Sequence, residues 1–128
     1  MTTQWQAKVL TVSDGVSTGH REDLSGRALV AFLEEHGFMV VEHALCADGE
    51  DTVFAQLLAM TSEFSGLVVS TGGTGFSPRD ETPEGALRVI QRVAPGLSEA
   101  MRAVNPLGRL SRGVAGIVGQ CIVVTTPG

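Results

Sequence analysis

One segment constrains the fold more than any other: residues 66–70 form a short, uncharged apolar run that leads directly into the glycine-rich residues 71–75. A short apolar run with no charge is typical of a strand that is buried on both faces. Strands of that kind occur in parallel sheets whose two faces are covered by helices. The segment therefore favours an α/β architecture with a loop of special conformation at the end of a buried strand.

Strand-like and helix-like segments alternate along the first two thirds of the chain. This alternation predicts a three-layer α/β/α fold with a mostly parallel central sheet, in which the carboxyl ends of the strands lie at one edge. The last third differs, because two strands flank Gly119 and predict a late antiparallel hairpin. We expect strands at residues 7–12, 38–45, 66–70, 114–118 and 121–126, and helices at 24–36, 51–63, 83–93 and 96–104.

Composition limits the classes of protein to which the chain can belong. Its 128 residues, 43% of them hydrophobic, are sized for a single domain over residues 1–128. The 14 acids exceed 9 scattered bases, which argues against nucleic-acid binding. The N-terminus has no apolar signal core and no run approaches the roughly 20 residues of a membrane span, so we predict a cytoplasmic protein without a membrane partner. Cys46 and Cys121 lack metal-ligand spacing and are expected in the core.

The turn after the third predicted strand has the composition of a phosphate-binding loop. Gly72, Gly73 and Gly75 allow backbone N–H groups to crowd around an anion, which a larger side chain would hinder. Asp80 follows closely, and a carboxylate beside bound phosphates repels them unless a divalent cation lies between, which predicts magnesium. The turn is also not followed by a Walker-type Gly-Lys-Ser/Thr, so it is a different phosphate loop.

The residues after the turn add to this prediction. Thr82 is expected to be an N-cap with Pro83 at the first helical position, so that a positive helix end faces the loop. A plain tight turn with Asp80 as a turn residue is the alternative, but it gives no reason for an Arg79–Asp80 pair followed by a cap. Arg79 itself stays unassigned between a phosphate and the neighbouring acids.

Acidic residues follow each of the first three predicted strands. Since parallel strands end at the same edge, Asp14 after residues 7–12, Asp48 after residues 38–45 and Asp80 are expected to face one ligand. Asp14 as a turn residue and Asp48 as a helix cap remain open alternatives. The three histidines are separated from one another and none resembles a member of a catalytic triad.

These residues belong to a longer series of motifs. The sequence resembles the molybdopterin adenylyltransferase family, MogA/MoaB type, over the range from about Val9 to the last residue. The motifs that carry the resemblance are Val12-Ser-Asp14 with Gly19 and Ser25-Gly26, Ser70-Thr-Gly-Gly-Thr-Gly75, Pro78-Arg-Asp80, Thr82-Pro-Glu84, Pro95-Gly96, Leu110-Ser-Arg112, Val114-Ala-Gly116 and Pro127-Gly128.

The resemblance implies an enzyme that uses Mg²⁺ and ATP to adenylate the terminal phosphate of molybdopterin and releases pyrophosphate. It implies that Asp80 and Asp48 are the critical acids, with Asp80 holding Mg²⁺. It also implies that the protein forms a homotrimer, or alternatively a homohexamer, and that a downstream molybdate-insertion protein is its partner. The residues implied to bind substrate or phosphate are Ser13, Asp14, Thr71, Gly72, Gly73, Thr74, Gly75, Thr82, Ser111, Pro127 and Gly128.

The sequence departs from the family pattern in two places. Gly85 stands where alanine is usual, at a cost of up to about 1 kcal/mol in a helix. The chain stops after its last predicted strand, where relatives continue, and we expect a C-terminal segment that is truncated or disordered. The alternative function is a non-catalytic molybdopterin-binding paralogue that keeps the cleft.

Overall fold

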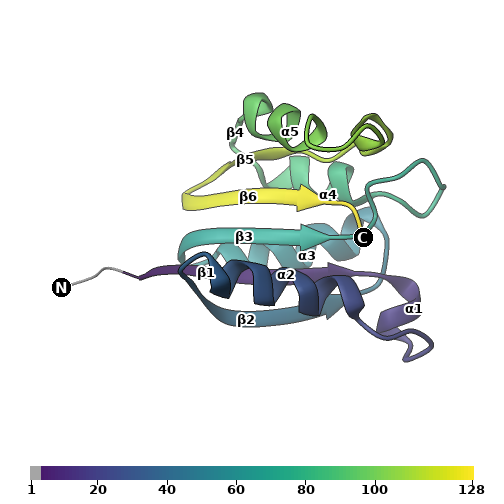
Figure 1. Cartoon of the computed structure of the whole chain (residues 1–128), viewed down its shortest axis with the longest axis horizontal. Helices are drawn as coiled ribbons and strands as arrows, with labels where there is room; N and C mark the ends of the chain where they lie inside the picture. Colours follow the sequence, from purple (N-terminus) through teal and green to yellow (C-terminus); the bar gives the residue numbers. More distant parts are fainter. Residues whose placement is uncertain (1–3) are drawn as a thin grey trace.

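A single six-stranded sheet, ordered β2-β1-β3-β6-β5-β4, forms the centre of the computed structural model, which describes residues 4–128 (Figure 1). β2, β1, β3 and β6 are parallel, whereas β5 is antiparallel to both β6 and β4. Residues 1–3, which belong to the N-terminus where no signal core is predicted, lie outside the described residues. The strands are β1 (Trp5–Val12), β2 (Phe38–Cys46), β3 (Ser65–Thr71), β4 (Arg92–Val93), β5 (Ala115–Val118) and β6 (Gln120–Thr126).

Helices cover both faces of this sheet, which confirms the predicted three-layer fold and the late hairpin. In Figure 1, α2 and α5 lie in front of the sheet, and α3 and α4 lie behind it. None of the helices in the described part of the chain is long and apolar enough to cross a membrane. The helices are α1 (Asp14–Ser17), α2 (Leu24–Glu35), α3 (Glu50–Thr61), α4 (Thr82–Val89), α5 (Pro95–Arg102) and the 3₁₀ turn η1 (Gly108–Leu110).

Successive side chains of β1 enter two different apolar clusters, one on each face of the sheet. Val9 packs in the cluster that includes Leu33 of α2, while Leu10 packs in the cluster that includes Leu57 of α3. This is the two-residue alternation of a strand buried on both sides. Burial of each such side chain contributes about 1.5–3 kcal/mol to the stability of the folded protein. Cys46 and Cys121 are buried free cysteines, as predicted.

The register of the parallel strands brings four chain segments to one level. Thr11 of β1 lies opposite Thr71 of β3, which in turn lies opposite Thr126 of β6. The next residue of β1, Val12, pairs with Cys46 at the end of β2. The loops that follow these strands therefore begin side by side, as the sequence predicts for a parallel sheet.

Two short elements correct the sequence-based prediction. The helix expected at residues 83–93 ends at Val89, because Ile90 is extended (φ −62°, ψ 125°) and the chain continues into β4. β4 forms by pairing with Ile117 and Gly116 of β5, a partner distant in sequence. Similarly, α1 occupies part of the expected loop after β1, where the Ser13 hydroxyl accepts a hydrogen bond from the N–H of Val16.

Gly85, the departure from the family pattern, has a packing role in α4. A Cβ at this position would lie 2.7 Å from the Glu50 carbonyl and 2.9 Å from the Val53 Cβ, both on α3. The missing side chain lets α3 and α4 approach closely, which offsets the helix propensity lost at glycine.

Candidate functional site

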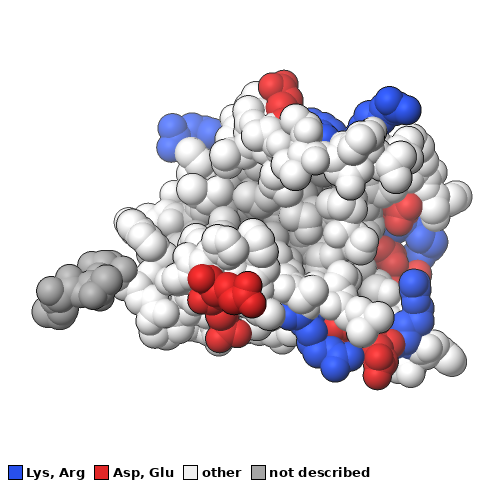
Figure 2. Space-filling view, in the orientation of Figure 1, with Lys and Arg blue, Asp and Glu red and all other residues white. Residues whose placement is uncertain are grey.

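A cavity of about 1060 Å³ lies at the carboxyl ends of β1, β3 and β6 and reaches α5 and η1. In the view of Figure 2, the surface between the α2 side and the α5 side is hollowed and uncharged, and groups of both signs gather at its edge. Most of the residues that the sequence singles out line the cavity. They are Ser13, Asp48, Thr71, Gly72, Gly73, Thr74, Gly75, Asp80, Ser111, Pro127 and Gly128.

Residues 71–75, called the glycine loop below, line the cavity and require glycine at two positions. Gly72 and Gly73 have φ values of 104° and 72°, which favour a residue without Cβ. A Cβ on Gly72 would also lie 2.1 Å from the Val12 carbonyl oxygen, so this loop lies directly against β1. The N–H groups of Gly73, Thr74 and Gly75 donate to no protein acceptor within residues 4–128. They are available to an anion in the cavity.

The last residues of the chain close one side of this loop. The Gly72 N–H donates to the Thr126 carbonyl at 2.9 Å, and the Thr71 hydroxyl donates to the Pro127 carbonyl at 2.9 Å. Across the loop, the hydroxyl of Ser111 donates to the Thr74 hydroxyl at 3.2 Å. Residues from two distant parts of the chain therefore hold the loop on both sides.

Asp48 enters the cavity from the loop after β2. Its Oδ2 accepts from the Asp14 N–H at 3.0 Å, and its Oδ1 lies 3.1 Å from the Cβ position of Gly73. Burial raises the pKa of Asp48, and the charges of Asp14 and Asp80 raise it further. The helix-cap alternative is wrong, because Gly49 is the N-cap of α3 and no side chain caps that helix.

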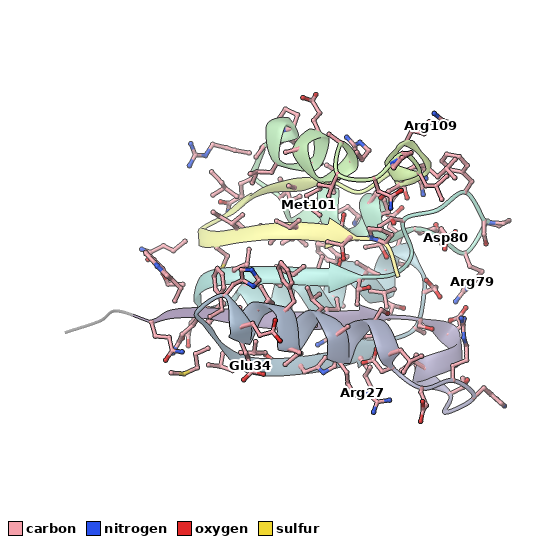
Figure 3. The ribbon with its side chains drawn as sticks, viewed as in Figure 1. Arg27, Glu34, Arg79, Asp80, Met101 and Arg109 are labelled. Atoms are coloured by element: carbon pink, nitrogen blue, oxygen red, sulfur yellow. The ribbon has the colours of Figure 1, made fainter. Side chains whose placement is uncertain are left out.

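Asp80 lies beside another glycine of the same loop. Its Oδ2 accepts from the Ser77 N–H at 3.0 Å and is 2.8 Å from the Cβ position of Gly75. Figure 3 shows Asp80 and Arg79 together on the segment between β3 and α4, with Met101 on α5. Asp48 and Asp80 thus lie beside two glycines of this loop and both line the same cavity.

Asp14 and Thr82 are the two predicted site residues that do not line the cavity. Asp14 begins α1 and pairs with Arg79, whose hydrogen bond lowers the pKa of Asp14. Thr82 was expected as an N-cap, but Glu81 occupies the N-cap position and Thr82 is the first residue of α4. Thr82 is completely buried beneath the loop, where its N–H donates to the Gly73 carbonyl at 3.0 Å. Its Oγ1 has no hydrogen-bond partner among the described residues.

Arg112, for which no role was predicted, does not line the cavity but holds the segment that does. Its Nε donates to the Gly75 carbonyl at 2.7 Å, its Nη2 donates to the Asp80 carbonyl, and its Nη1 pairs with Glu84 at 2.8 Å. One guanidinium thus fixes both ends of the segment between Gly75 and Asp80. The hydrogen bond from Arg112 also lowers the pKa of Glu84.

A further wall of the cavity comes from α5 and η1, and no role was predicted for it. Met101 on α5, and Leu107 and Leu110 around η1, line it with apolar side chains. Arg102 also lines it, and its Nη1 donates to the Gly113 carbonyl at 2.8 Å. The signal in the sequence is the amphipathic pattern of residues 96–104, which predicts a helix but not the cavity beneath it.

The donor set of the cavity fits a magnesium ion that is shared with phosphates. Mg²⁺ is usually held by one or two carboxylates together with substrate phosphates and water, rather than by a protein cage. Asp48 and Asp80 provide two such carboxylates, and residues 4–128 contain no group of three or more His, Cys, Asp or Glu placed to hold a metal by themselves.

Comparison with known proteins agrees with this architecture. The molybdopterin adenylyltransferase of Helicobacter pylori strain J99 is 39% identical over 127 residues, which cover 94% of this chain and 72% of that protein. Molybdenum cofactor biosynthesis protein B of Bacillus subtilis is 31% identical over 96% of this chain and 75% of its own length. The crystal structure of the molybdopterin biosynthesis enzyme MoaB from Thermus thermophilus superposes with a TM-score of 0.89 at 35% identity, over 98% of this chain and 82% of that one.

The family match covers nearly the whole chain, and the resemblance drawn from the motifs is confirmed. Residues 8–128 match the family described as "Probable molybdopterin binding domain", and the chain belongs to that family.

Proposed function

We propose that this protein adenylates the terminal phosphate of molybdopterin with Mg-ATP and releases pyrophosphate. The observation that carries the proposal is one cavity that holds both the carboxylates of Asp48 and Asp80 and a glycine loop, three of whose N–H groups have no acceptor among residues 4–128. A relative that is 39% identical is named molybdopterin adenylyltransferase, which supports the same reaction.

In this proposal the protein acts mainly by positioning charged groups. A phosphate oxygen of molybdopterin attacks the α-phosphorus of ATP, the bond from that phosphorus to the bridging oxygen breaks, and pyrophosphate leaves. The N–H groups of Gly73, Thr74 and Gly75 donate to phosphoryl oxygens where negative charge accumulates. Asp80, with Asp48 beside it in the cavity, would hold Mg²⁺, and the bound ion would neutralise part of the phosphate charge. The apolar wall beside Met101 accommodates a ring system.

The first test is formation of adenylated molybdopterin and pyrophosphate from molybdopterin and ATP, with and without Mg²⁺. Asp80→Asn should reduce turnover by about 100-fold or more, since loss of one preorganised charged group has effects of that size. Asp51→Asn is the matched control, because Asp51 pairs with Arg88 on the exposed surface of α3 and α4 and does not line the cavity. Unchanged turnover in Asp80→Asn would contradict the role of that residue.

The second candidate is a molybdopterin-binding paralogue without transfer activity. A relative that is 31% identical is named for molybdenum cofactor biosynthesis, and its name states no transferase activity, which supports this second function. Calorimetry with molybdopterin and with ATP separates the two functions. Binding of both ligands with turnover supports the enzyme, whereas molybdopterin binding without ATP binding supports the paralogue.

The remaining expectations from the family are part of the same proposal. They are a homotrimer, or alternatively a homohexamer, a cytoplasmic location, and transfer of the product to a molybdate-insertion protein. Light scattering on the purified protein decides between the two oligomers.

A further inference from the structure

Arg79, which the sequence left unassigned, makes three hydrogen bonds to two other loops of the site. Its Nε and Nη2 each donate to one carboxylate oxygen of Asp14 at 3.0 Å. Nη2 also donates to the backbone carbonyl of Asp48 at 2.8 Å. Such a two-point contact uses the planar fork of arginine and fixes its direction as well as its distance. Arg79 therefore joins the loops that follow β1, β2 and β3.

Asp14 and Asp48 are joined to each other by a reciprocal pair of hydrogen bonds. The Asp14 N–H donates to Oδ2 of Asp48 at 3.0 Å, and the Asp48 N–H donates to Oδ1 of Asp14 at 3.1 Å. Together with the contact from Arg79, these bonds hold the N–H, the carbonyl and one carboxylate oxygen of Asp48. The other carboxylate oxygen, Oδ1, lies beside Gly73 of the glycine loop.

The arrangement also separates the charges of the three acids. Asp14 does not line the cavity, and its carboxylate is compensated by Arg79, whose hydrogen bond lowers the pKa of Asp14. Asp48 and Asp80 do line the cavity. Without Arg79, the Asp14 carboxylate would be an uncompensated negative charge beside Asp48.

We propose that Arg79 is a positioning residue that acts through Asp14 to hold Asp48, so that one oxygen of Asp48 faces the glycine loop. Figure 3 shows Arg79 extending from its loop toward α1, where Asp14 lies. The consequence for turnover rests on the proposed function, but the effect on Asp48 does not. The competing role is direct binding of a substrate phosphate by Arg79, whose side chain is 59% exposed.

The structural arm of the test uses the protein without ligands. Hydrogen exchange at single amides reports the two hydrogen bonds between Asp14 and Asp48. Arg79→Met should accelerate exchange of both amides about tenfold or more, because it removes both charge-assisted hydrogen bonds to the Asp14 carboxylate and the bond to the Asp48 carbonyl. Arg79→Lys should have an intermediate effect, because a point charge cannot bridge both carboxylate oxygens.

Arg88→Met is the matched control for this measurement. Arg88 also bridges two acids, Glu50 and Asp51, at the surface, but it contacts neither Asp14 nor Asp48. It should leave exchange of the Asp14 and Asp48 amides unchanged. Unchanged exchange of these amides in Arg79→Met overturns the proposal, whatever the activity of the variant.

The kinetic arm separates positioning from direct phosphate binding. Arg79→Met should lower kcat about 10- to 100-fold, as a small misplacement of a reacting group does, with KM for ATP within about twofold. Asp14→Asn should produce the same defect, and the double variant should be no slower than the slower single variant. Additive losses, or a raised KM in Arg79→Met alone, would establish direct binding instead. If the unmodified protein transfers no AMP, the proposed function fails, and amide exchange still decides the role of Arg79.

Discussion

Gly73→Ala is expected to destabilise the protein strongly for two reasons. The loop has no space for a Cβ at this position, and the backbone there has a positive φ that disfavours any residue with a Cβ. Gly73 has a φ of 72°, and its ideal Cβ lies 2.1 Å from Oγ1 of Thr82 and 3.1 Å from Oδ1 of Asp48. Thr82 is completely buried, so its side chain has no free space into which it can move. The left-handed backbone costs about 1–2 kcal/mol in a residue with a Cβ. Overpacking of a buried position adds about 1–3 kcal/mol.

Together, the two contributions predict that the free energy of unfolding falls by about 2–5 kcal/mol. Urea unfolding followed by circular dichroism measures this change. Gly19→Ala is the matched control, since Gly19 has a φ of 80° and no atom within 4 Å of its Cβ position. This control should show only the backbone cost, about 1–2 kcal/mol. The difference between the two variants measures the steric conflict at the glycine loop.

A double variant tests the cause of that difference. Thr82→Ala removes the atom that conflicts with Cβ, and this Oγ1 makes no hydrogen bond with the described residues. Gly73→Ala combined with Thr82→Ala should therefore be about 1–3 kcal/mol more stable than the sum of the single changes predicts. If Gly73→Ala is no more destabilising than Gly19→Ala, the close packing of Thr82 under the loop is refuted.

Three further predictions concern the groups around the cavity. Asp48→Asn should raise the free energy of unfolding slightly at pH 7 while reducing turnover. Burial raises the pKa of Asp48 above its ordinary 3.8, so this gain should vanish in urea titrations below that pH, where the side chains of both variants are neutral. Arg112→Lys should destabilise the protein almost as much as Arg112→Met in urea unfolding, because lysine cannot reach two carbonyls and Glu84 together. Cys46, with a pKa raised to about 11 by burial, should react with iodoacetamide at pH 8 only after unfolding; rapid reaction of the native protein would contradict this.

The long elements of the fold could be predicted from the sequence because their signals are local. The apolar periodicity of α2 and α3 and the uncharged run of β3 are properties of neighbouring residues. The two-residue strand β4 could not be predicted in this way, because it exists only through pairing with β5. The helical pattern continued through Ile90 and Val93, but tertiary pairing decided their conformation.

The candidate site was predictable where it depends on strand ends. Asp48 and Asp80 lie in one cavity because parallel strands finish at one edge, and this follows from topology alone. The partner of Arg79 was not predictable, since Asp14 is 65 residues away and adjacent acids were equally plausible. The contacts of His43 with Asp23 at 3.0 Å and with Thr11 at 2.9 Å were not predictable either, because the three residues come from separate parts of the chain.

The position of β6 in the sheet has a consequence for how the chain folds during synthesis. β6 follows the other described elements in the chain, yet it lies between β3 and β5. Until this strand leaves the ribosome, β3 has no partner on one side, and the short strands β4 and β5 have no link to the rest of the sheet. The central pairing must then form across long sequence separations, which slows folding. Newly made chains should therefore depend on chaperones until β6 inserts, and substitutions in β6 should reduce the yield of folded protein more than comparable ones in β2 at the edge of the sheet.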